Sequence, residues 1–136
     1  MVSGVVVAAV VIAAATAFGL VWRWRDGRLR VGDDKRLRSS DLGCELGERA
    51  TLVQFSTVFC APCRATRRIL EDVAGMVDGV VHVEVDAETN LDLVRRFGIV
   101  RTPTTLILDA EGRIVRRATG TPRKVDVIAA LGAAVA

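Results

Sequence analysis

Residues 51–63 read TLVQFSTVFCAPC, and this stretch decides how the chain folds. Its first half, Thr51–Ser56, is an apolar run rich in strand-forming residues. Its second half places Cys60 and Cys63 three positions apart, where a segment with helical periodicity begins. Residues three apart in a first helical turn share one face, so the two thiols can form a disulfide and break it again.

Cys60 and Cys63 therefore have the arrangement that thiol–disulfide exchange requires. Cys60 lies at the positive end of the helix dipole, which favours thiolate over thiol. Cys63 lies one turn further in and is expected to displace whatever the first sulfur has captured. Pro62 lacks an amide hydrogen that a first turn leaves unpaired in any case. A permanent disulfide is the alternative, but it would close only a three-residue step and add little stability.

The N-terminal segment 1–22 contains no charged side chain and is almost wholly apolar from Val5 to Trp22. At about 1.5 Å per residue, a helix of this length spans a hydrocarbon core of about 30 Å. We therefore expect a transmembrane anchor at 1–22. A cleaved signal peptide is the rival interpretation, because Ala15–Ala17 resembles a cleavage site, but no basic residue precedes the apolar region.

A charged juxtamembrane linker is expected at 23–38, with turn signals at Asp26-Gly27 and Gly32–Asp34. Basic side chains crowd this linker, whereas the segment before it has none. Positive charge concentrated after the span predicts an outside N-terminus and a cytoplasmic C-terminal domain. Trp22 and Trp24 lie where interfacial aromatic residues are usual. The expected localisation is the cell membrane, single-pass, with the domain on the cytoplasmic side.

Composition argues against a nucleic-acid partner. The formal net charge is +3, and most of the basic cluster adjoins the apolar segment, where it suits anionic headgroups. With four Phe, two Trp and no Tyr, the chain offers no aromatic platform on which bases would stack.

A single domain is expected at 39–136, where strand and helix patterns alternate. Ser40-Asp41 resembles a helix N-cap before a short helix through Leu46, and Leu29 with Val31 suggests a short edge strand. The other expected elements are strands at 51–56, 80–86, 104–108 and 113–118, and helices at 60–77, at 90–97 and after Thr121-Pro122. The buried stripes expected on the first and last of these helices include Ala65, Ile69, Val73 and Met76, and Val125, Ile128 and Leu131.

This β-α-β-α-β-β-α order and its motifs resemble the thioredoxin family over about residues 48–132. The matching residues are Cys60-Ala61-Pro62-Cys63, Asp86, Phe97-Gly98-Ile99, Thr102-Pro103-Thr104, Gly112 and Gly120. A lone Cys-x-x-Cys is a weak signal, but a Thr-Pro about forty residues downstream, opening the next strand, makes it strong. The resemblance implies a thioredoxin-like α/β fold, with a central mixed sheet flanked by helices and preceded by one transmembrane helix.

The resemblance also implies the roles of the site residues. Cys60 and Cys63 would be catalytic, and the residues implied to contact substrate are Phe59, Ala61, Pro62, Thr102 and Pro103. In thioredoxin-like proteins the matching proline is cis and faces the dithiol, so that the residue before it binds substrate backbone as an added strand. From the residues alone, a trans proline that opens an edge strand is the alternative.

The chain departs from the family pattern around the dithiol. Phe59 stands where the family usually has Trp, and Ala61 where it has Gly. Gln54 replaces the buried Asp beneath the active site, and a carboxamide exchanges no proton near neutral pH. His82 replaces the partnering lysine, which makes it a possible proton relay close to Cys63. An ordinary hydrogen-bonded strand histidine is the alternative.

Cys44 is the odd cysteine, and we expect it to be a buried small hydrophobic residue, with a regulatory or intermolecular disulfide as the alternative. Cys44, Cys60, Cys63 and His82 include the right ligand types for zinc, but only one pair has metal-like spacing. We therefore expect no metal site and no cofactor.

The expected function is that of a membrane-anchored thiol–disulfide oxidoreductase. It would reduce disulfide-containing protein substrates through Cys60 and Cys63, and a separate, unidentified reductant would restore the dithiol. One alternative is an extracytoplasmic thioredoxin-like protein for disulfide reduction or cytochrome maturation. Another is a tethered module that binds peptides beside Pro103 without redox activity.

Overall fold

The computed structural model describes residues 1–25, 29–31 and 35–135. Its elements are α1 (Val2–Arg25), β1 (Arg30–Val31), α2 (Ser39–Leu42), β2 (Ala50–Ser56), α3 (Ala61–Met76), β3 (Val80–Asp86), α4 (Leu91–Arg96), β4 (Thr104–Asp109), β5 (Ile114–Thr119) and α5 (Lys124–Val135). The strands expected at 51–56, 80–86 and 104–108 are confirmed. The turn signals expected at Asp26-Gly27 and Gly32–Asp34 lie outside the described residues.

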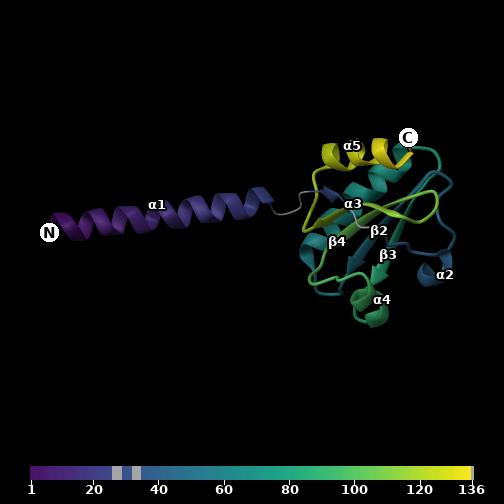
Figure 1. Cartoon of the computed structure of the whole chain (residues 1–136), viewed down its shortest axis with the longest axis horizontal. Helices are drawn as coiled ribbons and strands as arrows, with labels where there is room; N and C mark the ends of the chain where they lie inside the picture. Colours follow the sequence, from purple (N-terminus) through teal and green to yellow (C-terminus); the bar gives the residue numbers. More distant parts are fainter. Residues whose placement is uncertain (26–28, 32–34, 136) are drawn as a thin grey trace.

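α1 is one uninterrupted helix with no buried residue, and it lies apart from the other elements (Figure 1). Its apolar side chains cover the whole circumference, so no polar face is left to turn toward water. By length and composition α1 is able to cross a membrane, and a signal sequence near an N-terminus has the same properties.

The described strands form one mixed sheet in the order β1-β5-β4-β2-β3. β2 runs parallel to β3 and antiparallel to β4, and β5 runs antiparallel to β4 and β1. All seven residues of β2 are buried, because strands flank it on both sides and helices cover both faces. The short strand β1 confirms the edge strand expected beside Leu29.

Helices cover both faces of this sheet (Figure 1). α3 and α5 pack on one face, around Leu52 and Leu70, while α4 packs on the other, around Phe55 and Phe97. Side chains alternate between the two faces along a strand, so Gln54 points to the same face as Leu52. This alternation brings Gln54 beneath the first turns of α3.

The residues just before α2 belong to the packed part of the fold. Leu37 is fully buried in the core that α4 covers, and its N–H donates to the carbonyl of Gly112 at 2.9 Å. Arg36 forms an isolated antiparallel bridge with Arg113. The chain is therefore fixed against the β4–β5 hairpin before β2 begins.

The short helix differs from its prediction at both ends. α2 begins after Arg38 and ends at Leu42, so the N-cap expected at Ser40-Asp41 and the extension to Leu46 are wrong. Asp41 is the third helical residue, and its carboxylate accepts the Arg38 N–H at 3.0 Å. Gly43 ends the helix because it adopts a left-handed conformation with φ 70°.

The buried stripes of two helices were predicted only in part. In α3 the buried residues are Cys63, Thr66, Leu70 and Val73, whereas Ala65 and Met76 are exposed. A stripe drawn through apolar residues alone misses Thr66, which lies on the buried face of α3 and satisfies its hydroxyl by donating to the Pro62 carbonyl at 2.9 Å. In α5 Leu131 is buried as expected, but Val125 and Ile128 are not.

Gly112 and Gly43 provide a matched test of the fold. Both have positive φ, which costs a residue with a Cβ about 1–2 kcal/mol. A Cβ at Gly43 meets only open space, whereas one at Gly112 would collide with the Leu37 carbonyl. We expect Gly43→Ala to lose about 1–2 kcal/mol of unfolding free energy, and Gly112→Ala about 1–3 kcal/mol more because of this overpacking. Urea unfolding in detergent checks the difference, and equal losses would contradict the contact.

Candidate active site

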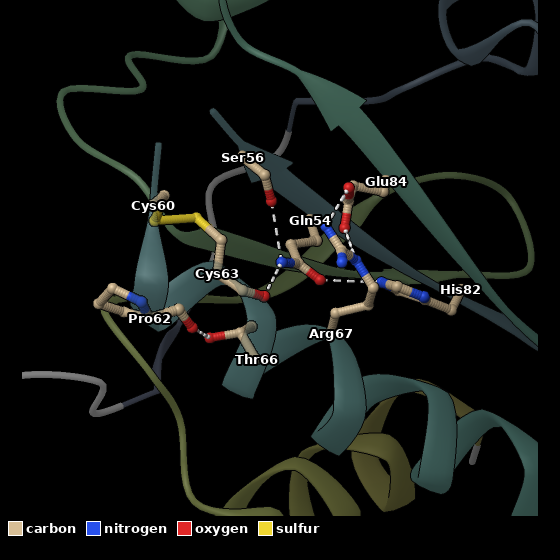
Figure 2. Close-up of polar contacts among 9 residues, drawn as sticks. All are labelled: Gln54, Ser56, Cys60, Pro62, Cys63, Thr66, Arg67, His82 and Glu84. Atoms are coloured by element: carbon tan, nitrogen blue, oxygen red, sulfur yellow. Dashed lines mark hydrogen bonds and ion pairs between the residues drawn. A yellow bond between two sulfur atoms is a disulfide. The ribbon is translucent and has the colours of Figure 1, made fainter. Parts of the chain in front are cut away.

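Cys60 and Cys63 are joined by a disulfide at the junction between β2 and α3 (Figure 2). Their Cα atoms are 5.2 Å apart. Cys60 is the extended residue that precedes the helix, and it is partly exposed, whereas Cys63 is 1% exposed on the inner face of the first turn. One sulfur is therefore open to an incoming molecule, and the other is accessible mainly from its partner.

The start of α3 leaves Cys60 in a favourable electrostatic position. Its side chain does not cap the helix, so it makes no hydrogen bond that would hold it against the backbone. The unpaired N–H groups of the first turn and the helix dipole both favour negative charge at this end. Pro62 lies within that turn, where its missing N–H costs nothing.

The second loop of the site contains the Thr102-Pro103 peptide bond, which is cis, as the resemblance implies. Pro103 is buried and its carbonyl accepts the Gly120 N–H at 2.8 Å, while Thr102 is half-buried. The hydroxyls of Thr57 and Thr102 are 3.4 Å apart, so this loop lies against the segment that leads into Cys60. The two loops therefore lie side by side, three residues before Cys60 in the chain.

Large apolar side chains on these two loops are open to solvent. Phe59 is 97% exposed, Val58 is 69% exposed, and Val100, on the other loop, is 88% exposed. Ala61 and Pro62 are exposed beside them. Exposed apolar side chains that gather around a reactive group suit contact with another molecule.

Gln54 lies directly beneath the helix turn that carries Cys63 (Figure 2). Its side chain is fully buried, and its Nε2 donates to the Ser56 hydroxyl at 2.9 Å and to the Cys63 carbonyl at 2.8 Å. The Oε1 atom is 3.0 Å from Nε2 of His82. An amide oxygen only accepts hydrogen bonds, so the His82 ring must be the donor in this contact. The neutral ring therefore carries its proton on Nε2.

Burial lowers the pKa of His82 below the usual value for an imidazole. Glu71 and Glu84 oppose this shift, and Arg67 adds to it. Arg67 and Glu84 form a bidentate ion pair beside the ring, with Nε to Oε2 at 2.6 Å and a second bond at 2.8 Å. His82 is therefore neutral over more of the acidic range than an exposed histidine.

Among the described residues, hydrogen bonds link His82 to the dithiol through Gln54, whose amide contacts the backbone carbonyl of Cys63 and not its sulfur. The sequence singled out both residues but did not predict this hydrogen bond. The ion pair of Arg67 and Glu84 was missed as well. The alternation of side chains along β3 places Glu84 on the same face as His82, and this pattern could have indicated the ion pair.

Cys44 lies outside this site, and the expectation that it is buried is wrong. It is exposed and free, two residues after the end of α2. Gly43 ends the helix, so the chain does not continue through Cys44 with a face against the core. Within the described ranges, no three His, Cys, Asp or Glu side chains gather where they would hold a metal ion.

The sequence of the chain is similar to thioredoxins of several bacteria. Thioredoxin of Alicyclobacillus acidocaldarius subsp. acidocaldarius is 34% identical over 86 residues, which are 62% of this chain and 81% of that protein. Thioredoxin of Mycobacterium tuberculosis (strain ATCC 25618 / H37Rv) is 31% identical over 81 residues, which are 59% of this chain and 69% of that protein. The human thioredoxin domain-containing protein 2 is 30% identical over 86 residues, but the match spans only 16% of its length.

Solved structures and the family model agree with this similarity. Spinach chloroplast thioredoxin f aligns with a TM-score of 0.57 at 25% identity, over 66% of this chain and 80% of that one. Chloroplastic thioredoxin z aligns with a TM-score of 0.56 at 27% identity, over 63% of this chain and 78% of that one. The thioredoxin family model matches residues 42–133. The chain belongs to the thioredoxin family, and Cys60 and Cys63 are the redox pair of a thiol–disulfide oxidoreductase.

Proposed function

We propose that the protein reduces disulfides of other proteins at the cytoplasmic face of a membrane. The observation that carries this proposal is the asymmetry of the redox pair: Cys60 is partly exposed at a helix start, and Cys63 is 1% exposed behind it. Thiol–disulfide exchange needs one sulfur that a substrate can approach. It also needs a second, sheltered sulfur that attacks the mixed disulfide once it has formed. A binding module has no need of this asymmetry.

The proposed reaction begins with both cysteines reduced. The Cys60 thiolate attacks one sulfur of the substrate, the substrate disulfide breaks, and the other substrate sulfur leaves as a thiolate and takes a proton. Cys63, after losing its proton, attacks Sγ of Cys60 and releases the first substrate sulfur. Two electrons have then passed to the substrate, and the Cys60–Cys63 disulfide is closed. A separate reductant must reopen it.

The proposed substrate contacts are Phe59, Ala61, Pro62, Thr102 and Pro103. The first three are exposed on the loop and helix turn around Cys60. Thr102 is half-buried and adjoins that loop through Thr57, and its proposed role is to pair through its backbone with an extended segment of the substrate. The near-complete exposure of Phe59 supports contact with apolar residues that flank the substrate's disulfide.

Replacing Cys63 tests the two-step exchange. Cys63→Ser keeps the attacking sulfur but removes the one that resolves the mixed disulfide, so covalent adducts between Cys60 and substrate are expected to accumulate. Non-reducing electrophoresis of membranes from cells that express the variant checks this, with Cys44→Ser in the background to remove the other exposed thiol. Adducts that persist in the matched Cys60→Ser control, or their absence from Cys63→Ser, would contradict the mechanism.

The proposed topology has α1 as a retained anchor and the domain in the cytoplasm. Support comes from the apolar circumference of α1 and from Arg23 and Arg25 in its last turn, after a span without charged side chains. The alternative topology places the same domain outside the membrane, where it would act in disulfide reduction or cytochrome maturation.

A reporter fused after Ala136 decides between these locations. We expect a reporter that is active only in the cytoplasm to give signal, and one that is active only outside to give none, because positive residues after a span stay inside. Mass spectrometry of the membrane-bound protein checks that α1 is retained. The reverse reporter result would show that the domain lies outside the membrane. If mass spectrometry shows that α1 has been removed, the segment is a signal sequence.

His82 is the proposed titrating group near Cys63. Its influence would be electrostatic, because Gln54 lies between them and an amide does not pass a proton on at neutral pH. Charge on the His82 ring would favour the Cys63 thiolate through the intervening dipole. If His82→Gln leaves the pH profile of disulfide reduction unchanged, this proposed role is wrong.

The same variant tests the buried environment of the ring. Unfolded His82 takes up a proton near pH 6.5 and folded His82 only at lower pH, so the unfolded state binds more protons between the two pKa values. The free energy of unfolding is therefore unaffected by His82 protonation above about pH 6.5. It decreases as the pH falls from there through the folded pKa. We expect the urea midpoint to drop more between pH 7.5 and 5 in the wild type than in His82→Gln. Parallel drops would contradict the lowered pKa.

A further inference from the structure

A short segment joins α1 to the domain. Residues 26–28 are all that separate Arg25, the last residue of α1, from Leu29. Four steps of chain reach at most about 14 Å. Leu29 packs against the core that α3 and α5 cover, and β1 follows it directly. The point where the packed domain begins is therefore held within about 14 Å of the end of α1.

The direction of β1 shows from which end the chain enters the sheet. β1 runs antiparallel to β5, with Arg30 beside Arg117. Further along the chain, Arg36 forms a bridge with Arg113, just before β5 begins. The chain thus runs from the C-terminal end of β5 toward its N-terminal end. Leu29, which precedes Arg30, lies on the side of the C-terminal end of β5.

The C-terminal end of β5 adjoins the redox pair. The N–H of Gly120, directly after β5, donates to the Pro103 carbonyl at 2.8 Å. The Thr121 hydroxyl donates to the carbonyl of Pro62, in the first turn of α3, at 3.4 Å. The β4–β5 turn lies at the other end of the sheet, beside the start of β2. α1 is therefore attached at the end of the domain that carries the redox pair.

Charge is distributed unevenly at this end of the domain. Three segments next to the redox pair contain three Arg and neither Asp nor Glu: 57–64, 99–103 and 119–123. Arg64 and Arg101 are exposed, and Arg123 pairs with Asp126 of α5. The acidic side chain of Glu88 lies on the loop after β3, at the sheet edge opposite β1. The surface directly around the redox pair is therefore cationic.

A disulfide at the surface of a bilayer has surroundings that match this end of the domain. The membrane span beside it is apolar, and the cytoplasmic leaflet presents anionic headgroups. The exposed apolar side chains of Val58, Phe59 and Val100 suit the first of these surroundings. Arg64 and Arg101 suit the second. Both kinds of side chain lie at the end of the domain to which α1 is attached.

We propose that the redox end of the domain faces the bilayer, and that its substrates are disulfides of membrane proteins close to that surface. This inference rests on the proposed function, because it needs an anchored reductase. The exchange is unchanged: Cys60 and Cys63 pass two electrons to the substrate disulfide and close their own. Position selects the substrate, because the short segment after α1 confines the redox pair to the neighbourhood of the lipid.

Two model substrates test this preference. Both are single-span peptides with one internal disulfide, which directly follows the span in the near peptide. In the far peptide it follows a helical spacer of about 25 residues, or about 38 Å. The full chain with Cys44→Ser, reduced and freed of reductant, is mixed with either peptide in vesicles of phosphatidylcholine and phosphatidylglycerol. In a single turnover, measured by thiol labelling, we expect the near disulfide to be reduced about tenfold faster.

A chain with about 20 flexible Gly and Ser residues inserted after Arg25 is the matched control, because its domain reaches both disulfides. Its rates for the two peptides are expected to agree within about twofold. Equal rates in the chain without the insertion, or reduction of soluble insulin alone, would overturn the proposal and leave the reductase function intact. Failure to reduce the peptides and insulin would refute the reductase function, and this inference with it.

Lipid charge gives an independent measurement. Arg64→Glu reverses an exposed charge beside the redox pair, and Arg113→Glu makes the same change at the other end of the sheet. With phosphatidylglycerol present, we expect Arg64→Glu to slow reduction of the near peptide, relative to insulin, about fivefold. Arg113→Glu is expected to leave this ratio unchanged. Equal effects of the two variants, or an equal effect of Arg64→Glu in phosphatidylcholine alone, would overturn the orientation toward the bilayer.

Discussion

β2 lies between β3 and β4 with helices over both faces, so none of its seven residues is exposed. The chain leaves this strand at Ser56 and enters α3 at Ala61, which fixes where the first turn of the helix begins. Both sulfurs of the site belong to that turn or precede it directly. Because β2 is closely packed on every side, the position of its C-terminal end is fixed. The positions of Cys60 and Cys63, which follow that end, are fixed as a result.

The polar network below the pair has the same origin. Gln54 is the one long polar side chain of β2, and it stays buried because the Ser56 hydroxyl, the Cys63 carbonyl and the His82 ring use its hydrogen-bonding groups. A buried group left without such partners costs about 1–3 kcal/mol. The carboxamide carries no charge near neutral pH, so within this network of described residues His82 is the side chain next to Gln54 that can gain a charge.

Sequence patterns predicted the features that local rules control. The β2 strand, the helix after Cys60 and the β4–β5 hairpin follow from periodicity and turn residues, and the family resemblance added the cis bond before Pro103. Features decided by tertiary contacts were missed. Thr66 is buried although it is polar, and Cys44 is exposed because Gly43 ends α2 early.

The contact between Gln54 and His82 shows the same limit. The two residues are 28 positions apart and on different strands, and each alone is consistent with several partners. Only the parallel pairing of β2 and β3, with Leu52 beside His82 and Gln54 beside Glu84, brings the amide and the ring together. Pairing of this kind depends on the whole sheet and is not encoded by either segment alone.

The pairing of Cys60 with Cys63 also has a consequence for oxidation by peroxides. A peroxide that approaches the reduced protein meets Cys60 first and converts its thiolate to a sulfenic acid. Cys63, one turn away, condenses with that sulfenic acid, expels water and restores the disulfide. Because Cys63 lies within disulfide distance of Cys60, this condensation competes with further oxidation to the irreversible sulfinic and sulfonic acids.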